Sequence, residues 1–262
     1  MRTAGGLTRL DAEALRDLAE SPPSPAPPAG GPSHRISEQR YMIEIGPDPD
    51  PDMNIVSRLR LDGHDITAAI EDARAAFRAA GRSEATWEVG SGATPDGLAD
   101  RLRAEGMTDH EPGAMLALAC TTEPASPASG IDTERVETDA QFEEVRAIFA
   151  DGDGWHPSDE WLRGPGYVTR YLARTPDGRA VATADITWLE HDDTVFLGGA
   201  LTLPEHRGRG AYRALVHRRW QEAAERGRTV LVTQSEPMSQ PILLRLGFEV
   251  VGEITVLLDR FG

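Results

Sequence analysis

The segment Leu201–Ala211 constrains the fold of this chain more than any other segment. It reads Leu-Thr-Leu-Pro-Glu-His-Arg-Gly-Arg-Gly-Ala, an apolar strand followed by a short glycine-containing loop and at once by a helix. Backbone N–H groups in such a loop point into one concavity, and the helix dipole adds positive potential there. Gly208 and Gly210 let the backbone approach an anion, and Arg207 and Arg209 add positive charge. The stretch therefore predicts a site for a phosphate or pyrophosphate group.

The same stretch differs from the two common nucleotide-binding loops. A Walker loop ends in Gly-Lys-Ser or Gly-Lys-Thr, whereas here the helix continues as Ala211-Tyr212-Arg213. The dinucleotide fingerprint needs a third glycine at the position of Arg213. A glycine-rich turn between a strand and a helix is also compatible with plain turn geometry, so its neighbours in the chain decide the interpretation.

Two segments rich in small residues and proline divide the chain. Residues 1–34 are predicted to form a short N-terminal helix and a mobile connector, because the segment Ser21–Ser33 contains six prolines. Residues 121–130 form a second small and polar segment. We therefore expect one folded unit over residues 35–122 and another over residues 130–262.

Hydrophobic periodicity predicts alternating strands and helices in both units. In the first unit, strands are expected at residues 41–45, 54–61, 85–89 and 114–120, and helices after Asp65 and after Thr94. In the second unit, Thr138 and Gln141 have the spacing of a capping box, and residues 152–166 are expected to be irregular. Strands at 167–174, 179–191, 194–203, 229–234 and 249–259 and helices at 211–226 and 238–246 follow. This pattern indicates the α/β class, with mixed twisted sheets flanked by helices.

The ends of the two units resemble each other. Trp87–Val89, then a helix ending in Leu102–Met107, is matched about 140 residues later by Leu231–Thr233 and a helix ending in Leu243–Phe248. Such self-similarity indicates an internal duplication, although strand–helix–strand units are common in unrelated folds.

The order strand, Pro-Glu-His-Arg-Gly-Arg-Gly, helix, strand and a helix ending in Leu-Gly-Phe resembles the coenzyme A half of the GNAT superfamily of N-acyltransferases. The resemblance covers most of residues 131–262. The family's phosphate loop corresponds to Arg207–Ala211, with Glu205 where Gln or Arg is usual. The turn Asp62–Asp65 of the first unit lacks the Arg-Gly-x-Gly pattern. The resemblance therefore implies two GNAT-like domains, of which the N-terminal one is degenerate and the C-terminal one has the acyl-CoA site.

The resemblance also implies how an acyl-CoA would be held. The backbone of Leu201 and Leu203 would pair with the pantetheine arm, and an N–H near Leu203 would stabilise the oxyanion of the tetrahedral intermediate. A neutral amine would attack the thioester directly, once a base has removed its ammonium proton. The implied coenzyme-binding residues are Leu201, Thr202, Leu203, His206, Arg207, Gly208, Arg209, Gly210 and Ala211.

The sequence departs from the family at the catalytic positions. The common general acid is a tyrosine five residues before the Phe of the Leu-Gly-Phe ending, and that position is Leu243. The central strand at 194–203 has no carboxylate that would act as a base. Asp185, Ser235 and Glu236 remain as catalytic candidates; a solvated Asp185 and a helix-capping Glu236 are the alternatives.

Trp155 is a candidate substrate contact. It lies in the acidic segment 151–160, where its ring would stack on a substrate while the acids attract a cation. A solvated acidic loop with one docked aromatic ring is the alternative. His191 and His206 lack partners at metal-ligand spacing, so no metal site is expected.

Charge and cysteine content narrow the partners and the compartment. The formal net charge of −16 argues against a nucleic-acid partner and suits a cationic small molecule. Cys120 is the single cysteine and lies in an apolar run, so we expect a buried structural thiol, not a nucleophile, in a reducing, cytoplasmic compartment. We expect neither a transmembrane segment nor a signal peptide, because the sequence has no long apolar run.

The leading hypothesis is transfer of an acetyl group from acetyl-CoA to an amine of a small molecule, by a monomer or homodimer. One alternative is a non-catalytic acyl-CoA-binding module, which the missing tyrosine favours. Another is a GNAT-fold transferase with a different donor, such as a longer acyl-CoA or an aminoacyl-tRNA, although the acidity of the chain weakens the tRNA version.

Overall fold

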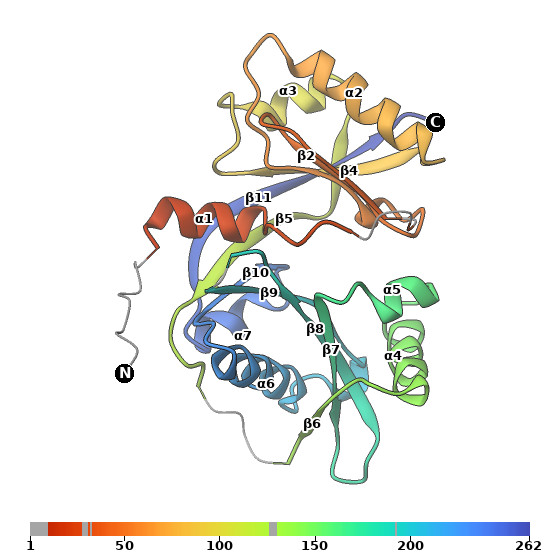
Figure 1. Cartoon of the computed structure of the whole chain (residues 1–262), viewed down its shortest axis with the longest axis vertical. Helices are drawn as coiled ribbons and strands as arrows, with labels where there is room; N and C mark the ends of the chain where they lie inside the picture. Colours follow the sequence, from red (N-terminus) through yellow and green to blue (C-terminus); the bar gives the residue numbers. More distant parts are fainter. Residues whose placement is uncertain (1–9, 28–30, 32, 126–129, 192) are drawn as a thin grey trace, which may run out of the picture.

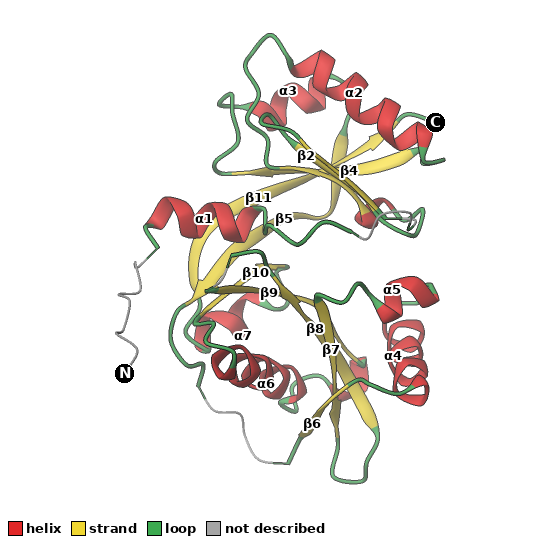
Figure 2. Ribbon diagram, viewed as in Figure 1, coloured by secondary structure: helices red, strands yellow, loops and turns green. Residues whose placement is uncertain are grey.

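The strands of the computed structural model form one mixed sheet with helices on both faces (Figure 1). The structure describes residues 10–27, 31, 33–125, 130–191 and 193–262. Within these residues the strands follow the order β1-β2-β3-β4-β11-β5-β10-β9-β8-β7-β6. Figure 2 shows how the helices flank this sheet. The α/β class and the mixed sheet predicted from the sequence are confirmed.

The elements of the N-terminal half are Ala12–Glu20 (α1), His34–Ser37 (β1), Met42–Ile45 (β2), Pro51–Met53 (a 3-10 turn, η1), Asn54–Ser57 (β3), Ile66–Ala79 (α2), Glu84–Gly90 (β4), Leu98–Ala104 (α3) and Thr108–Cys120 (β5). Those of the C-terminal half are Asp132–Arg135 (β6), Asp139–Gly152 (α4), Asp159–Arg163 (α5), Val168–Arg174 (β7), Ala180–Trp188 (β8), Thr194–Thr202 (β9), Pro204–His206 (η2), Ala211–Glu225 (α6), Val230–Ser235 (β10), Gln240–Arg245 (α7) and Glu249–Arg260 (β11).

Short-range signals set several helix ends as predicted. The capping box at the start of α4 forms, because Thr138 Oγ1 accepts from the Gln141 N–H at 3.3 Å and Gln141 Oε1 accepts from the Thr138 N–H at 3.0 Å. Gly81 follows α2 with φ +73, a conformation that stops a helix. Asp65 directly precedes α2 as expected and occupies its N-cap position, although its side chain makes no capping hydrogen bond among the described residues.

Two expectations need correction. The helix predicted to open at Thr94 begins at Leu98, because the Thr94 backbone bonds instead to Leu59 and Leu61, at 3.1 and 3.0 Å. The segment predicted to be irregular at 152–166 contains α5, whose N-cap Ser158 accepts from the Trp161 N–H at 3.2 Å.

The last strand of each half lies in the sheet of the other half. Strand β5 pairs with β10 and β11, and strand β11 pairs with β4 and β5, all antiparallel. In Figure 1 these two long strands run side by side through the middle of the molecule. Each half therefore completes its sheet only with a strand from the other, and the predicted boundary at residues 121–130 divides the chain without dividing the sheet.

The two halves share one topology. Strand β3 pairs in parallel with β4 across helix α2, and β9 pairs in parallel with β10 across helix α6. A further helix, α3 or α7, then leads to the exchanged strand. This correspondence agrees with the internal duplication that the sequence indicates.

Side-chain alternation places the helices in two layers. On β5, Leu118 and Cys120 pack into the α6 and α7 core, whereas Ala117 and Ala119 pack with Leu18 of α1. The same alternation on β7 and β11 puts α2, α3, α6 and α7 on one face and α1, α4 and α5 on the other. Among the described residues, no helix has the length and apolarity needed to cross a membrane.

Helix α1 is fixed over the seam between the halves. Its buried Glu20 accepts from the Ser91 N–H at 2.8 Å and the Gly92 N–H at 3.1 Å. A Cβ on Gly90 or Gly252 would run into the Glu20 carboxylate, so the two glycines leave room for this carboxylate in its observed place. The N-terminal helix is therefore part of the molecular body.

The described part of the proline-rich connector, residues 21–27, is packed, which contradicts the expectation of a free segment. Ser21 Oγ accepts from the Arg58 N–H at 3.1 Å, and the Pro23 carbonyl accepts from the Glu190 N–H at 3.1 Å. These bonds join the connector to both halves. Residues 28–30 and 32 of the connector lie outside the described residues.

The exchange predicts that the C-terminal half does not fold alone. Without residues 1–129, β11 has no partner strand, and its buried Val256, Leu257 and Leu258 become exposed. We expect residues 130–262 expressed alone to aggregate, and to become soluble when co-expressed with residues 1–129. Size-exclusion chromatography and circular dichroism measure both outcomes. A monodisperse, folded fragment 130–262 would contradict the importance of the exchange.

Candidate functional site

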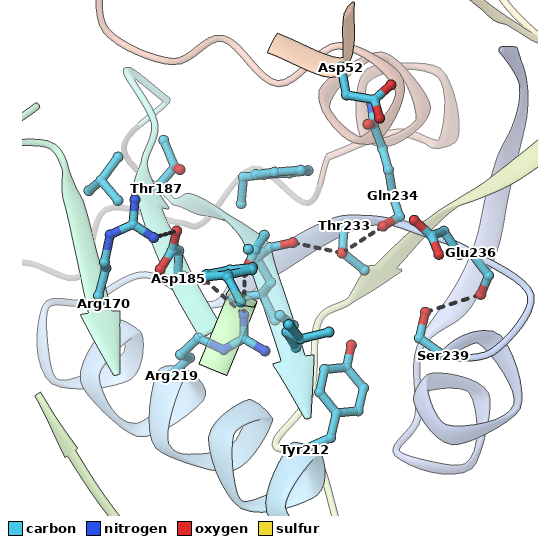
Figure 3. Close-up of a pocket in the computed structure, with 18 of the residues that line it drawn as sticks. Asp52, Arg170, Asp185, Thr187, Tyr212, Arg219, Thr233, Gln234, Glu236 and Ser239 are labelled. Carbon is cyan, nitrogen blue, oxygen red and sulfur yellow. Dashed lines mark hydrogen bonds and ion pairs between the residues drawn. The ribbon is translucent and has the colours of Figure 1, made fainter. Parts of the chain in front are cut away.

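A cavity of about 1630 Å³ lies where strands β9 and β10 separate. Both halves line it, and Figure 3 shows side chains from several strands and from α6 converging on it. The first half contributes Asp52, Met53, Ile55, Thr86 and Glu88. The first half therefore forms part of the cavity wall.

The separation of β9 and β10 exposes backbone at the centre of the sheet. Their parallel pairing covers only Thr194–Phe196 of β9 and Val230–Val232 of β10. A bulge follows on the β8 side of β9, centred on Gly199, whose φ is +55. A Cβ at Gly199 would lie 2.4 Å from Asp185 Oδ2, so only glycine fits there. The bulge frees backbone groups of β9 at the cavity.

The loop predicted to bind phosphate opens onto the same cavity. Gly208 and Gly210 have φ of +75 and +96, and α6 starts directly after them at Ala211. No side chain caps the N-terminus of α6. A Cβ on Gly208 would meet no atom within 4 Å, so glycine is required there by the backbone conformation while the space beside it is open. The N–H groups at the start of α6 have no side-chain partner among the described residues, and the space beside Gly208 has room for an anion.

Most of the predicted coenzyme-binding residues line the cavity. These are Leu201, Thr202, His206, Arg207, Gly208, Gly210 and Ala211. Arg209 is exposed and does not line it, and Leu203 is buried among side chains of α4 and β7.

The N–H of Leu203 itself is already hydrogen-bonded, so the oxyanion donor expected near Leu203 is a different group. That N–H donates to the Val181 carbonyl at 3.0 Å, so it is not available to a thioester oxygen. Because successive residues of a strand point their backbone groups to alternate sides, Thr202 faces the open side of β9. The Thr202 carbonyl there accepts from Arg207 Nε at 3.2 Å.

The corresponding turn of the first half is already filled. Asp62 Oδ1 accepts from the His64 N–H at 2.9 Å, immediately before α2. The Asp62 carboxylate thus binds a backbone N–H at the turn that corresponds to the glycine loop of the second half. The turn of the first half does not line the cavity.

Asp185 is buried in the cavity wall and paired. Its Oδ2 accepts from Arg170 Nη1 at 2.5 Å, and Arg170 also donates to the carbonyls of Trp161 and Leu162. Burial raises the pKa of Asp185 to about 6, against the lowering effect of Arg170 and then of Arg219. Oδ1 has no hydrogen-bond partner. The alternative of a solvated Asp185 is wrong, since its side chain is only 9% exposed.

The other two catalytic candidates differ in position. Ser235 is buried, donates to the Leu116 carbonyl of β5 at 3.2 Å, and does not line the cavity, because it pairs with the exchanged strand. Glu236 lines the cavity and is exposed. Its backbone carbonyl accepts from Ser239 before α7, while its side chain makes no capping bond among the described residues.

Leu243 lies in the core and not in the cavity. It is 1% exposed and packs with Leu246 and Phe248. A hydroxyl does reach the cavity from another element, because Tyr212, the second residue of α6, lines it (Figure 3). Burial raises the pKa of Tyr212, which keeps its hydroxyl protonated. Sequence reasoning missed this tyrosine, although it follows the glycine loop directly.

Trp155 lines the cavity as one ring of an aromatic cluster. Its centroid lies 5.1 Å from that of Phe149 and 4.5 Å from that of Trp161, both in edge-to-face geometry. The Arg170 guanidinium stacks on Trp161 at 3.6 Å. The cluster is a packed wall that presents Trp155 to the cavity, so the picture of an acidic loop with one docked ring is incomplete.

Glu88 of β4 also lines the cavity, and sequence reasoning did not single it out. It is half-buried at the cavity, and burial raises its pKa to about 8, with a further increase from Glu44 and Asp52 and an opposing effect of Gln234. Gln234 Nε2 donates to Glu88 Oε2 at 3.4 Å. A carboxylate with such a pKa is suited to accept a proton near neutral pH.

Charge is distributed unevenly along the cavity. Arg207, Arg213 and Arg245 line it at the N-terminus of α6 and along α7. The lining carboxylates belong to other elements: Asp52, Glu88, Asp153, Glu160, Asp185 and Glu236. Arg170 and Arg219 also line the cavity, beside Asp185. The N-terminus of α6 therefore suits an anion, whereas Glu88, on the wall formed by β4, suits a cation. No group of His, Cys, Asp or Glu within the described part of the chain is arranged to hold a metal ion.

Comparison with known proteins agrees with this geometry. Residues 179–256 match the family described as FR47-like protein. No curated protein matches the sequence significantly. The matched segment runs from the turn before β8 into β11 and includes the glycine loop.

Several solved structures share the fold over nearly the whole chain. A GCN5-related N-acetyltransferase from Kribbella flavida is 23% identical, with a TM-score of 0.67 over 88% of this chain and 90% of that one. A tandem GNAT protein from the clavulanic acid biosynthesis pathway is 16% identical, with a TM-score of 0.59 over 96% and 94%. A GCN5-related N-acetyltransferase from Sphaerobacter thermophilus is 16% identical, with a TM-score of 0.58 over 85% and 81%. The resemblance to a tandem GNAT fold is confirmed.

The buried pair in the cavity wall predicts a stability effect. Arg170→Met should lower the free energy of unfolding by about 3–5 kcal/mol at pH 7.5, because it leaves the Asp185 carboxylate buried and unpaired. Arg163→Met, which removes an exposed partner of Asp139, should cost at most about 1 kcal/mol. Denaturant titration measures both values. The Arg170→Met penalty should grow as the pH rises through about 6, where Asp185 ionises; a penalty independent of pH would contradict the assigned pairing.

Proposed function

We propose that this chain, built of two halves with the GNAT fold, transfers an acyl group from an acyl-CoA to an amine of a small molecule. The simplest donor is acetyl-CoA. One observation supports this function above the others: the unfilled glycine loop and the separated ends of β9 and β10 open onto one cavity. Coenzyme and acceptor would therefore meet where sheet backbone is exposed.

The residues around the loop fit the pyrophosphate and pantetheine of coenzyme A. The space beside Gly208 is open, the N–H groups at the start of α6 are uncapped, and Arg207 and Arg213 line the cavity there. His206 lines it too, with Nδ1 lacking a partner. We assign the pantetheine arm to the open edge of β9 at Thr202, since the Leu203 N–H is already bonded.

The proposed reaction is direct aminolysis of the thioester. The amine lone pair attacks the thioester carbon, the C–N bond forms, and the C–S bond breaks as the tetrahedral intermediate collapses. Backbone N–H groups freed by the bulge at Gly199 and Ala200 are the available donors to the oxyanion. The amine loses one proton to a base before attack and a second on the way to the amide.

Tyr212 is the proposed proton donor to the leaving thiolate. It takes the place of the family's tyrosine, whose position here is the buried Leu243. The thiol of coenzyme A resembles a free cysteine, with a pKa of about 8.5, so it leaves readily even with weak protonation. General acid catalysis typically contributes about 10²–10⁴-fold, which sets the scale of the effect of Tyr212→Phe.

A non-catalytic acyl-CoA-binding module is the second candidate function. The burial of Leu243 favours it, because the family's usual general acid is missing from its place. The carboxylates that line the cavity favour the enzyme, since a binding module has no need of a site for a cation. They also disfavour an aminoacyl-tRNA donor, as does the net charge of −16.

We place the protein in the cytoplasm, which its single buried cysteine suits.

The loop assignment predicts a selective loss of coenzyme binding. Gly208→Val forces a β-branched residue to φ +75 and projects a side chain into the open space, so the Kd for acetyl-CoA should rise by roughly tenfold or more. Gly227→Val is the matched control, because Gly227 has φ +76, equally empty surroundings and a place outside the cavity. Calorimetry measures the Kd of both. Equal affinity in the two variants would contradict the assignment.

Turnover separates the enzyme from the binding module. Acetyl-, propionyl- or a longer acyl-CoA at 100 times its Kd should stabilise the protein by about 2.7 kcal/mol, which a thermal-shift screen detects. With the best donor, a panel of small primary amines should release free thiol above the hydrolytic background. Stabilisation by acyl-CoA without thiol release from any amine would establish the binding module instead.

A further inference from the structure

We propose that the degenerate first half supplies the acceptor subsite, in which Glu88 binds the acceptor as an ammonium ion and removes its proton. This inference rests on the proposed function of the cavity. It names the substrate class, a cationic primary amine, and gives the half without a coenzyme loop a direct part in the reaction. The residue comes from β4, whereas the proposed coenzyme loop precedes α6.

The geometry of β4 aims Glu88 at the cavity. Trp87 and Val89 pack into the core under α2 and α3, so Glu88 points from the opposite face of the strand. Val256 pairs with it across β11 and also lines the cavity. The Gln234 amide reaches Glu88 at 3.4 Å. The pairing of β9 with β10 ends at Val232, and Gln234 lies two residues further along β10. The Gln234 side chain therefore connects Glu88 to the point where the two strands separate.

Glu88 has no cation beside it in the described part of the chain. The two neighbouring carboxylates already have partners: Glu44 accepts from Arg35 Nε at 2.9 Å, and Asp52 contacts His110 Nε2 at 2.8 Å. Glu88 makes no ion pair among the described residues, and its only side-chain hydrogen bond there is the long one from Gln234. A half-buried carboxylate surrounded by Glu44 and Asp52 favours a positively charged ligand.

A second, independent observation also points to a missing donor in this cavity. Asp185 is 6% exposed, lies on the cavity side of β8, and has an Oδ1 with no hydrogen-bond partner among the residues that the structure describes. Buried polar atoms are nearly always paired, so an unpaired carboxylate oxygen marks a place where a ligand N–H fits. Figure 3 shows Asp185 and Gln234 on opposite sides of the space above Tyr212. An acceptor amine bound between Asp185 and Gln234 would direct its N–H donors at both walls of the cavity.

The proton transfers balance. The ammonium gives one proton to Glu88, and the neutral amine attacks the thioester carbon while the C–S bond breaks. The second amine proton leaves as the amide forms, and the thiolate receives a proton from Tyr212, which the amine proton replenishes. Glu88 then releases its proton to solvent. The net change is an ammonium and a thioester to an amide, a free thiol and one proton.

The groups that face Glu88 set its pH dependence. They are Glu44 from β2, Asp52 from η1 and the neutral Gln234 from β10; burial and the two carboxylates raise the pKa of Glu88 to about 8. Glu88 acts as a base only when ionised. Therefore kcat/KM for an amine should rise with pH through about 8 in the free enzyme.

Glu88→Gln tests the subsite in the full-length protein, with Glu84→Gln as the matched control. Glu84 lies on the same face of β4 but pairs with Arg260 and does not line the cavity. In Glu88→Gln, kcat/KM for the best amine should fall about 10²–10⁴-fold and the inflection near pH 8 should vanish. The Kd for acetyl-CoA should stay within about twofold of wild type in both variants. A decrease below threefold in Glu88→Gln, or an equal decrease in both variants, overturns the proposal.

A binding experiment separates failure of the subsite from failure of the proposed function. Calorimetry with putrescine, benzylamine and the neutral 1-butanol, at saturating coenzyme A, requires no turnover. We expect at least one of the two amines to bind, 1-butanol not to bind, and Glu88→Gln to weaken the amine by roughly tenfold or more. Amine binding that survives Glu88→Gln, or no amine binding to the wild type, overturns the subsite. Absence of thiol release with Glu88-dependent binding intact overturns only the transferase reaction.

Discussion

The mutual exchange of strands β5 and β11 is the constraint on which the rest of the structure depends. Each of these strands pairs with two strands, and for each at least one of those partners belongs to the other half. The exchange holds β4 in the same sheet as β10, with α1 covering the seam through Glu20 and its two close-packed glycines. Without it, the face of β4 that presents Glu88 would not share a cavity with the separated ends of β9 and β10. The chemistry proposed here is therefore a property of the joined sheet.

Local signals in the sequence predicted the anion loop, the capping box and the tandem GNAT fold, because each is set by residues close together in the chain. The errors have a common cause. Whether the Leu203 N–H or the Ser235 hydroxyl faces the cavity depends on strand register, which a shift of one residue reverses. Glu88 could not be identified from the sequence, because its place at the site depends on pairing between β4 and β11, which lie far apart in the chain.

The two halves share one topology but differ at the turn before the helix that joins their parallel strands. At the turn before α6, glycines leave backbone N–H groups open; at the turn before α2, the Asp62 carboxylate satisfies one of them. The proposed anion site therefore belongs to the second half alone among the two turns. The first half in turn presents the Glu88 carboxylate on its sheet face, where the matching residue of the second half is the apolar Val232. Both halves contribute carboxylates to the cavity, and Glu88 is the one that β4 adds.

The exchange also orders events during synthesis. The ribosome completes β4 long before β11, since Ile254 pairs with Gly90 roughly 160 residues earlier in the chain. Until then one edge of β4 and one edge of β5 lack their native partner, although α2 and α3 can already pack on the nascent sheet. The N-terminal half therefore emerges with unpaired strand edges, a feature that makes folding intermediates prone to aggregation. Native pairing, and with it the cavity, forms only when residues 249–260 have left the exit tunnel.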